Sequence, residues 1–416
     1  MKQSYTIKIH FDTRREKKSG KYPVKLRVYV KQLKKRCDYP TKFEFTKQEF
    51  KSIWETTKPK EKYKDLRLQL QAIENKANET AKLIEPFSFE KFEKKLHLKT
   101  GEGENVFFHY NEIINKNKNK GRIGNAISYE YSFKSIKNYI KYKKGSDYEN
   151  LKFVEIDKDW LEDYQYYMVD TLERSYSTVG IFLRSLRAVF NKAINDNEIP
   201  AEIHPFGKGK YEIPEADKAK KVLSKEQIKQ LFESIPRTPE QEKAKDFWFF
   251  SYACNGINIK DIVLLKYKDL SDKKFSYYRA KTINTKRKKI LIEVYLNEYI
   301  LSIIEKYGNK DKSPKNYIFS VIEDNQNEED KHRKIKNFTK FINQNIKKLA
   351  IAEGLPSEIS TYWARHSFAT MAIRNGKSLE FVGEAFSHSD KKTTQNYFAG
   401  FEDDVKKEFA QNIMNF

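Results

Sequence analysis

The sequence predicts a multidomain α+β protein with a small N-terminal β-sheet domain, an all-α middle domain, and a mainly α C-terminal domain that contains a small β-hairpin sheet. Three observations support this prediction. Apolar and polar residues alternate within the first 45 residues, as they do in half-buried strands. Helical spacing of apolar residues dominates from about residue 60 to residue 205, until a stretch rich in Pro, Gly and Lys interrupts it. The 416 residues leave room for two or three domains.

Three strands and a short helix are expected at the N-terminus. Apolar residues occupy every second position of the first two strands: Tyr5, Ile7, Ile9 and Phe11, then Val24, Leu26, Val28 and Val30. A third strand is expected near Cys37–Phe45, and Thr46 with Glu49 forms a capping box that begins a helix. Lysine and arginine, Arg27 among them, occupy the outer face. The sheet is therefore predicted either to read a DNA groove or to be a β module with a solvated basic face.

The middle of the chain is expected to be helical. A long polar helix from Lys60 to about Leu83 connects the sheet to a helical region that extends to about Pro205. Within that region, Lys137 and Lys141 lie outside one apolar stripe, and Arg184 and Arg187 lie outside another. Charged outer faces are usually only solvated, so each basic patch alone is weak evidence for nucleic-acid binding.

Turn-forming residues mark the start of the last domain. Gly207–Lys210 and Pro214 lie among several lysines, and the glycines lack the flanking residues of a phosphate-binding P-loop. Ser224 with Gln227 forms a second capping box. The predicted domains are residues 1–83, 84–205 and 223–416, with a linker at 206–222.

The charge balance favours a polyanionic partner. Lys and Arg number 81 against 58 for Asp and Glu, a formal net charge of +23, which favours nucleic acid over an anionic membrane. No run of about 18 apolar residues is present, so no membrane span is expected. The N-terminus lacks the apolar core of a signal peptide, and Cys37 and Cys254 form no metal-ligand cluster. A cytoplasmic protein without a metal is expected.

Groups suited to phosphate chemistry lie near the C-terminus. Arg365 and His366 open one helical pattern, and His388 precedes Tyr397 by nine residues. Arginine offers a fork to phosphate oxygens, histidine donates a hydrogen bond or moves a proton, and tyrosine can be a nucleophile. The structural alternative is a helical end-piece with a few polar residues.

These residues resemble the C-terminal half of the tyrosine recombinase (phage integrase) family, whose pattern is His-x-x-Arg-His, then Gly-His, then Tyr. Arg365 falls on the second arginine of that family, His388 on its later His/Trp position, and Tyr397 on the nucleophile. Two departures are visible, because Tyr362 replaces the first histidine and Ser387 replaces the glycine. More narrowly, the chain resembles an integrase of a Bacteroidetes-type mobile element.

The resemblance implies a site-specific DNA recombinase that needs no metal, ATP or other cofactor. Tyr397 would attack a phosphodiester and form a 3′-phosphotyrosine, Arg365 and His388 would hold the nonbridging oxygens, and Lys281 would protonate the leaving 5′ oxygen. Tyr362 would only form a hydrogen bond, and His366 is expected to pack. The N-terminal sheet would bind "arm" sites, and the helical domain would be a core-binding domain. The expected partners are double-stranded DNA, three further copies of the chain in a tetramer, and accessory DNA-bending proteins. The tail after Tyr397 would dock onto a neighbouring subunit or pack on its own domain.

The family's other catalytic arginine is missing. Its equivalent stretch here is Cys254–Asp261, and Asn258 occupies the arginine position. The predicted hairpin, with strands at Phe275–Thr282 and Ile290–Val294, places Arg279 two residues before Lys281, and strand geometry would point both side chains to one face. Arg279 is therefore a candidate replacement for the missing charge, the alternative being a contact with DNA backbone or solvent.

Two rival functions stay open. Asn258 is consistent with a catalytically impaired family member that only occupies recombination sites. A type IB topoisomerase shares the chemistry, although the N-terminal sheet and the helical domain favour a recombinase.

Overall fold

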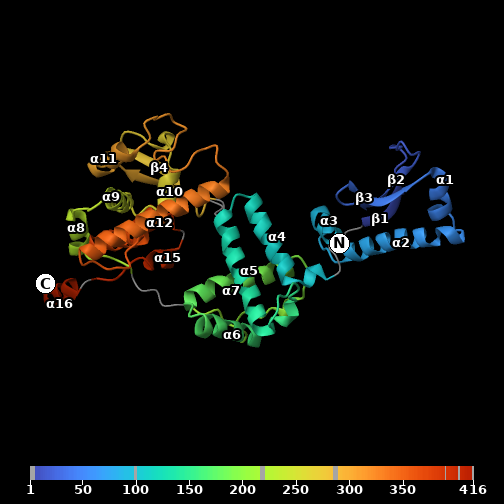
Figure 1. The fold of residues 1–416 in the computed structure, drawn as a ribbon, viewed down its shortest axis with the longest axis horizontal. Helices are drawn as coiled ribbons and strands as arrows, with labels where there is room; N and C mark the ends of the chain where they lie inside the picture. The colour runs from blue at the N-terminus through green and yellow to red at the C-terminus, as the bar shows by residue number, and fades with distance from the viewer. Residues whose placement is uncertain are drawn as a thin grey trace. The chain divides into compact units, whose positions relative to one another are not determined.

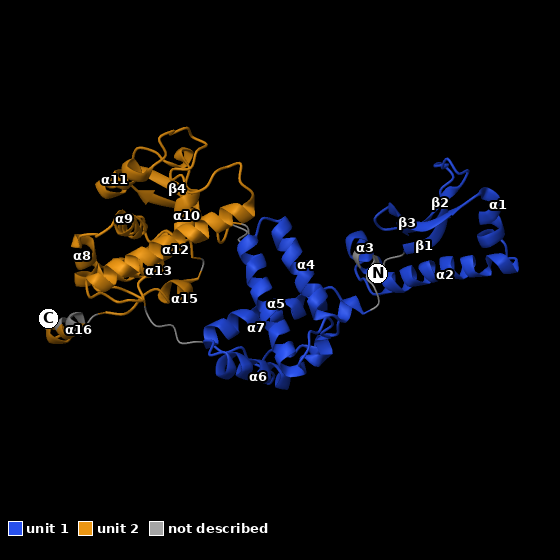
Figure 2. Cartoon of the chain, viewed as in Figure 1, with its two compact units in different colours: residues 1–216 blue, residues 217–416 orange. Residues whose placement is uncertain are grey.

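The computed structural model describes residues 5–97, 101–215, 221–283, 289–388, 390–401 and 403–414. It divides into two compact units, Met1–Ala216 and Asp217–Phe416, each with its own arrangement of elements (Figure 2). The predicted α+β class is confirmed, with small antiparallel sheets in both units and helices elsewhere. None of the helices in the described ranges combines the length and apolar character needed to cross a bilayer.

The first unit begins with an antiparallel sheet in the order β1-β2-β3, formed by Tyr5–Phe11, Tyr22–Val30 and Lys35–Phe45. Thr46 caps α1 (Lys47–Phe50) in the predicted capping box, and a π-helical turn follows. Helix α2 (Glu61–Lys82) runs along the apolar face of the sheet (Figure 1), where Leu70 and Ala77 join the strands' inward residues in one core. Helix α3 (Phe89–His97) closes this part through Phe92. The sheet therefore keeps one face covered and one face in solvent.

Four longer helices make up the rest of the first unit: α4 (Val106–Asn119), α5 (Ile123–Lys144), α6 (Lys158–Tyr166) and α7 (Tyr176–Asn195). The core lies between α4, α5 and α7, as the two predicted apolar stripes require. Phe206 and Tyr211 are buried in the same core. The first part of the segment predicted as a linker is thus packed against the helices.

The second unit contains α8 (Lys225–Glu233), α9 (Pro239–Ala253), α10 (Ile259–Leu264), α11 (Glu298–Tyr307), α12 (Glu328–Ala352), α13 (Thr361–Arg374), α14 (Leu379–Ala385), α15 (Lys391–Gln395) and α16 (Asp403–Asn412). Ser224 caps α8 in the second predicted capping box. Helix α9 packs against α11, α12 and α13 and supplies aromatic residues to the main core. A separate small core joins α13, α14 and Tyr397. Tyr397, the candidate nucleophile, therefore packs against a small hydrophobic cluster that is separate from the main core of the unit.

The hairpin of the second unit is shorter than predicted. Its strands are β4 (Lys274–Tyr278) and β5 (Leu291–Tyr295). The chain leaves β4 at Tyr278 and turns, because the backbone N–H groups of Thr282 and Ile283 both donate to the carbonyl of Arg279. The prediction that Arg279 and Lys281 share a strand face was wrong: Arg279 is buried, whereas Lys281 is exposed in the turn.

Candidate active site

Arg365 is the centre of a polar site buried in the second unit. It belongs to the inward face of α13, and the residue is 2% exposed. Its guanidinium donates to the carbonyl oxygens of Gly256 (2.8 Å) and Phe386 (3.5 Å) and lies 3.5 Å from the centre of the Phe386 ring. Burial, together with the nearby charge of Arg279, lowers the pKa of Arg365 to about 10. The group still carries its positive charge at neutral pH.

Gly256 lets the loop before α10 approach Arg365 closely. Its φ of +66° is a left-handed conformation, and a Cβ there would lie 2.9 Å from the Cα of Arg365. Only glycine meets both conditions without displacing its neighbours. The glycine of this loop therefore determines where the guanidinium of Arg365 lies.

Arg279 reaches the same place from the turn after β4. Its Nη1 donates to the carbonyl of Phe386 at 3.3 Å, the same oxygen that accepts from Arg365, and the residue is 8% exposed. Among the described residues, the Nε of each arginine is buried and has no hydrogen-bond acceptor. Buried donors are normally paired, so two adjacent guanidiniums with unpaired donors are chemically suited to an anion.

Asp261 places Arg279. Its carboxylate accepts the backbone N–H of Ala280 at 2.9 Å and a hydrogen bond from the side chain of Asn258. Burial raises the pKa of Asp261, whereas these hydrogen bonds and the two arginines favour its charged form. Asn258, the residue in the arginine position, thus donates a hydrogen bond to the carboxylate that holds the Arg279 turn.

Tyr397 lies beside the arginines at the end of α15. The hydroxyl of Tyr362 donates to the hydroxyl of Tyr397 at 3.0 Å. Burial opposes ionisation of Tyr397, but this hydrogen bond and the charges of Arg365 and Arg279 lower its pKa below the ordinary value. The predicted hydrogen-bonding role of Tyr362 therefore has a defined partner in the phenol of Tyr397.

Two histidines flank the Tyr397 ring. The His366 ring lies 4.6 Å from it, centre to centre, and makes the expected packing contact, and burial lowers the pKa of His366. The His388 ring lies at 5.4 Å, and its Nδ1 is 3.1 Å from Thr394 Oγ1. Ser387, which replaces the glycine of the family pattern, has a φ of +53°. Glycine, the residue of the family pattern, adopts this left-handed conformation readily, whereas serine adopts it at a cost in backbone free energy.

Two residues of α13 hold the chain around Tyr397. Thr370 Oγ1 donates to the carbonyl of Tyr397 (3.3 Å) and accepts the N–H of Ala399 (3.2 Å), and Arg374 Nε donates to the carbonyl of Gly400 (3.0 Å). The tyrosine is thus held next to Arg365 of the same chain. The sequence did not predict roles for Thr370, Arg374 or Gly256. Thr370 follows Arg365 by five residues on the same helix.

The remaining predicted residues lie elsewhere. Lys281 is exposed two residues beyond Arg279. In the first unit, Arg184 and Arg187 are exposed on α7 and Lys137 and Lys141 are exposed on α5, where Lys141 pairs with Asp147. Arg27 lies on the solvent face of the sheet and pairs with Asp38. In the described ranges, no group of His, Cys, Asp or Glu could hold a metal ion.

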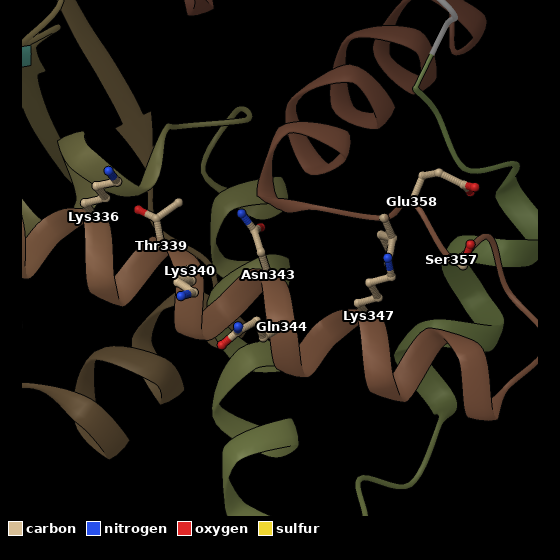
Figure 3. Close-up of a pocket in the computed structure, with 9 residues that line it drawn as sticks. Lys336, Thr339, Lys340, Asn343, Gln344, Lys347, Ser357 and Glu358 are labelled. Carbon is tan, nitrogen blue, oxygen red and sulfur yellow. The ribbon is translucent and has the colours of Figure 1, made fainter. Parts of the chain in front are cut away.

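A groove of about 560 Å³ whose lining residues are mostly of polar types runs along α12 in the second unit (Figure 3). Its lining includes Lys336, Lys340, Gln344 and Lys347. Asn343, also in the lining, accepts the N–H of Thr361 at 2.8 Å and so holds the first turn of α13, the helix of Arg365. This row of lysines was not predicted from the sequence.

Family models match three successive parts of the chain: an Arm DNA-binding domain at residues 9–92, a phage integrase SAM-like domain at 105–213 and the phage integrase family at 221–403. Tyrosine recombinase XerD of Oceanobacillus iheyensis is 25% identical over 305 residues, covering 70% of this chain and 91% of the relative. Tyrosine recombinase XerA of Thermococcus onnurineus is 23% identical over 224 residues, covering 54% of this chain and 71% of the relative.

Solved structures share the fold. The Tn1549 transposon integrase in complex with a circular intermediate DNA has a TM-score of 0.52 at 16% identity, covering 74% of this chain and 99% of that one. The XerH site-specific recombinase bound to a palindromic difH substrate has a TM-score of 0.50 at 17% identity, covering 84% of this chain and 96% of that one.

Proposed function

The chain belongs to the phage integrase family of tyrosine recombinases, and we propose that it is a site-specific DNA recombinase that cleaves and rejoins DNA through Tyr397. The observation that carries this proposal is the buried pair Arg365 and Arg279, whose unused donors lie beside a tyrosine of lowered pKa. An anionic phosphate fits the donors, and the phenolate supplies the nucleophile. The impaired-member alternative is less favoured, because Arg279 supplies the charge that Asn258 lacks.

The proposed step is a transesterification. Tyr397 loses its proton to solvent, its oxygen forms a bond to phosphorus, and the bond from phosphorus to the 5′ oxygen breaks. Lys281, in the exposed turn, protonates the leaving 5′ oxygen, and the product is a 3′-phosphotyrosine. A second 5′-hydroxyl then reverses the step without external energy, because the phosphodiester bond is exchanged rather than hydrolysed.

Charge develops on the nonbridging oxygens during this exchange. Arg365, Arg279 and His388 are the proposed donors to those oxygens, since preorganised donors in a dry site stabilise such charge strongly. Asp261 and Asn258 act indirectly by positioning the Arg279 turn.

The first test is covalent capture of DNA. A duplex nicked close to the cleavage position releases a short fragment and traps the 3′-phosphotyrosine, which migrates with the protein under denaturing conditions. The parent protein is expected to accumulate this complex, and Tyr397→Phe is expected to bind the duplex but form none. A complex that persists in Tyr397→Phe would place the nucleophile on another residue.

Double-stranded DNA is the proposed partner, contacted by Arg184, Arg187, Lys137 and Lys141 of the helical domain and by the N-terminal sheet at separate arm sites. Strand exchange pairs two duplexes, so a homotetramer on DNA is proposed, with accessory DNA-bending proteins. The proposed substrate is the DNA of a mobile element, and the proposed location of the protein is a bacterial cytoplasm.

The tail supports the proposed assembly. Phe409, Ile413 and Met414 around α16 are 66%, 54% and 72% exposed. An apolar groove of about 390 Å³, lined by residues such as Phe232 and Tyr252, lies on α8 and α9 of the same unit. Docking of one copy's tail into another copy's groove would bury both surfaces.

A further inference from the structure

The solvent face of the N-terminal sheet carries basic side chains on each of its three strands. Lys8 of β1 lies opposite Arg27 of β2, which lies opposite Asp38 of β3. The adjacent rows on this face place His10 beside Lys25, and Tyr29 beside Arg36. The opposite face is covered by the core, so these side chains are the sheet's accessible surface.

Arg27 is an arginine of this face whose guanidinium is held by a carboxylate of the neighbouring strand. Its Nε and Nη2 both donate to the carboxylate of Asp38 at 2.7 Å, and each side chain is only 17% exposed. This pairing uses one edge of the guanidinium. The other edge, formed by Nη1 and the second hydrogen of Nη2, can still donate two parallel hydrogen bonds.

A second carboxylate does the same for neighbouring groups. Asp12, 1% exposed, accepts from Lys25 at 2.8 Å and from Arg14 at 2.9 Å. Side chains held in this way lose little conformational freedom on binding. Lys8 and Arg36 are exposed, as side chains that contact a phosphate backbone usually are.

We infer that Arg27, held by Asp38, reads a guanine base in the major groove of duplex DNA. Guanine presents the two acceptors O6 and N7 there, which match the free edge of an arginine, and strands can enter this groove. The inference rests on the proposed binding of arm-type DNA by this sheet and names the residue that gives it sequence preference.

The test selects sites from a pool of duplexes with a randomised central stretch, using the full-length protein. Arg27→Lys keeps the charge but loses the fork, and Asp38→Asn keeps the shape but frees the guanidinium. Both variants are expected to lose the preference for guanine at one and the same base pair, by roughly ten- to a hundredfold, because a bidentate contact discriminates by that order. Arg36→Lys is the matched control and is expected to leave every selected position unchanged.

The outcomes separate the inference from the proposed function. If Arg27→Lys and Asp38→Asn, both shown to be folded by circular dichroism, select the same sites as the parent, Arg27 reads no base. If the two variants alter different positions, the pair is not one reading unit. Covalent capture of a nicked core duplex through Tyr397, measured on the same variants, is expected to be unchanged. If neither the parent nor the variants form this covalent complex, the recombinase proposal is contradicted and the guanine result still stands.

Discussion

Tyr362→Phe removes a single hydroxyl, the donor that lies 3.0 Å from the phenolic oxygen of Tyr397, the proposed nucleophile. This donor stabilises the phenolate more than the phenol, so its loss raises the pKa of Tyr397. A hydrogen bond to a charged group contributes about 1.5–3 kcal/mol. Tyr362 is 45% exposed, and solvent screening places its effect at the lower end. One pKa unit corresponds to about 1.4 kcal/mol, so we expect a rise of about one unit.

The assay is single-turnover cleavage of a nicked duplex at saturating protein, followed across neutral and alkaline pH. Below the pKa of Tyr397 the phenolate fraction limits the rate, so the variant is expected to be about tenfold slower there and to recover as pH rises. DNA affinity is expected to be unchanged. Tyr362→His is the matched variant, because it restores the imidazole of the family pattern and changes the shape of the profile. A Tyr362→Phe profile that coincides with the parent's at every pH would show that the hydroxyl does not assist ionisation.

Other substitutions test the rest of the site. Arg279→Ala is expected to slow single-turnover cleavage by roughly a hundred- to a thousandfold at saturating DNA, as loss of a preorganised donor does. Arg279→Lys is expected to rescue the rate only in part. A parental rate in Arg279→Ala would refute the proposal that Arg279 supplies the charge missing at Asn258. Thr370→Val is expected to slow cleavage without weakening DNA binding, because the Tyr397 segment loses two hydrogen bonds. Thr370→Ser keeps the hydroxyl and is expected to restore the rate. Failure of this rescue in a folded protein would argue that Thr370 does not position Tyr397. Gly256→Ala is expected to lower the free energy of unfolding by at least about 1–2 kcal/mol, the usual cost of a left-handed conformation, and urea denaturation would measure it; an unchanged midpoint would show that the loop and Arg365 can move apart.

Local patterns were sufficient for much of the fold. The alternation in residues 5–45 became β1 to β3, and the capping boxes at Thr46 and Ser224 begin helices where expected. These features depend on neighbours within a few residues of each other, so the sequence shows them directly. The hairpin strand was predicted too long, because the turn after it is held by a contact between Ala280 and Asp261, which lies nineteen residues before Ala280.

The sequence by itself determined which groups are proposed for the chemistry, since the spacing of Arg365, His388 and Tyr397 resembles the family pattern. Only the tertiary structure decided how they are supported. Arg279 points inward because a distant carboxylate binds the turn, and Tyr397 stays beside Arg365 because Thr370 bonds the backbone around it. Such contacts join residues far apart in the chain and depend on how loops are directed after each element ends. No periodicity records that direction, because a loop's course follows from the packing of the elements around it.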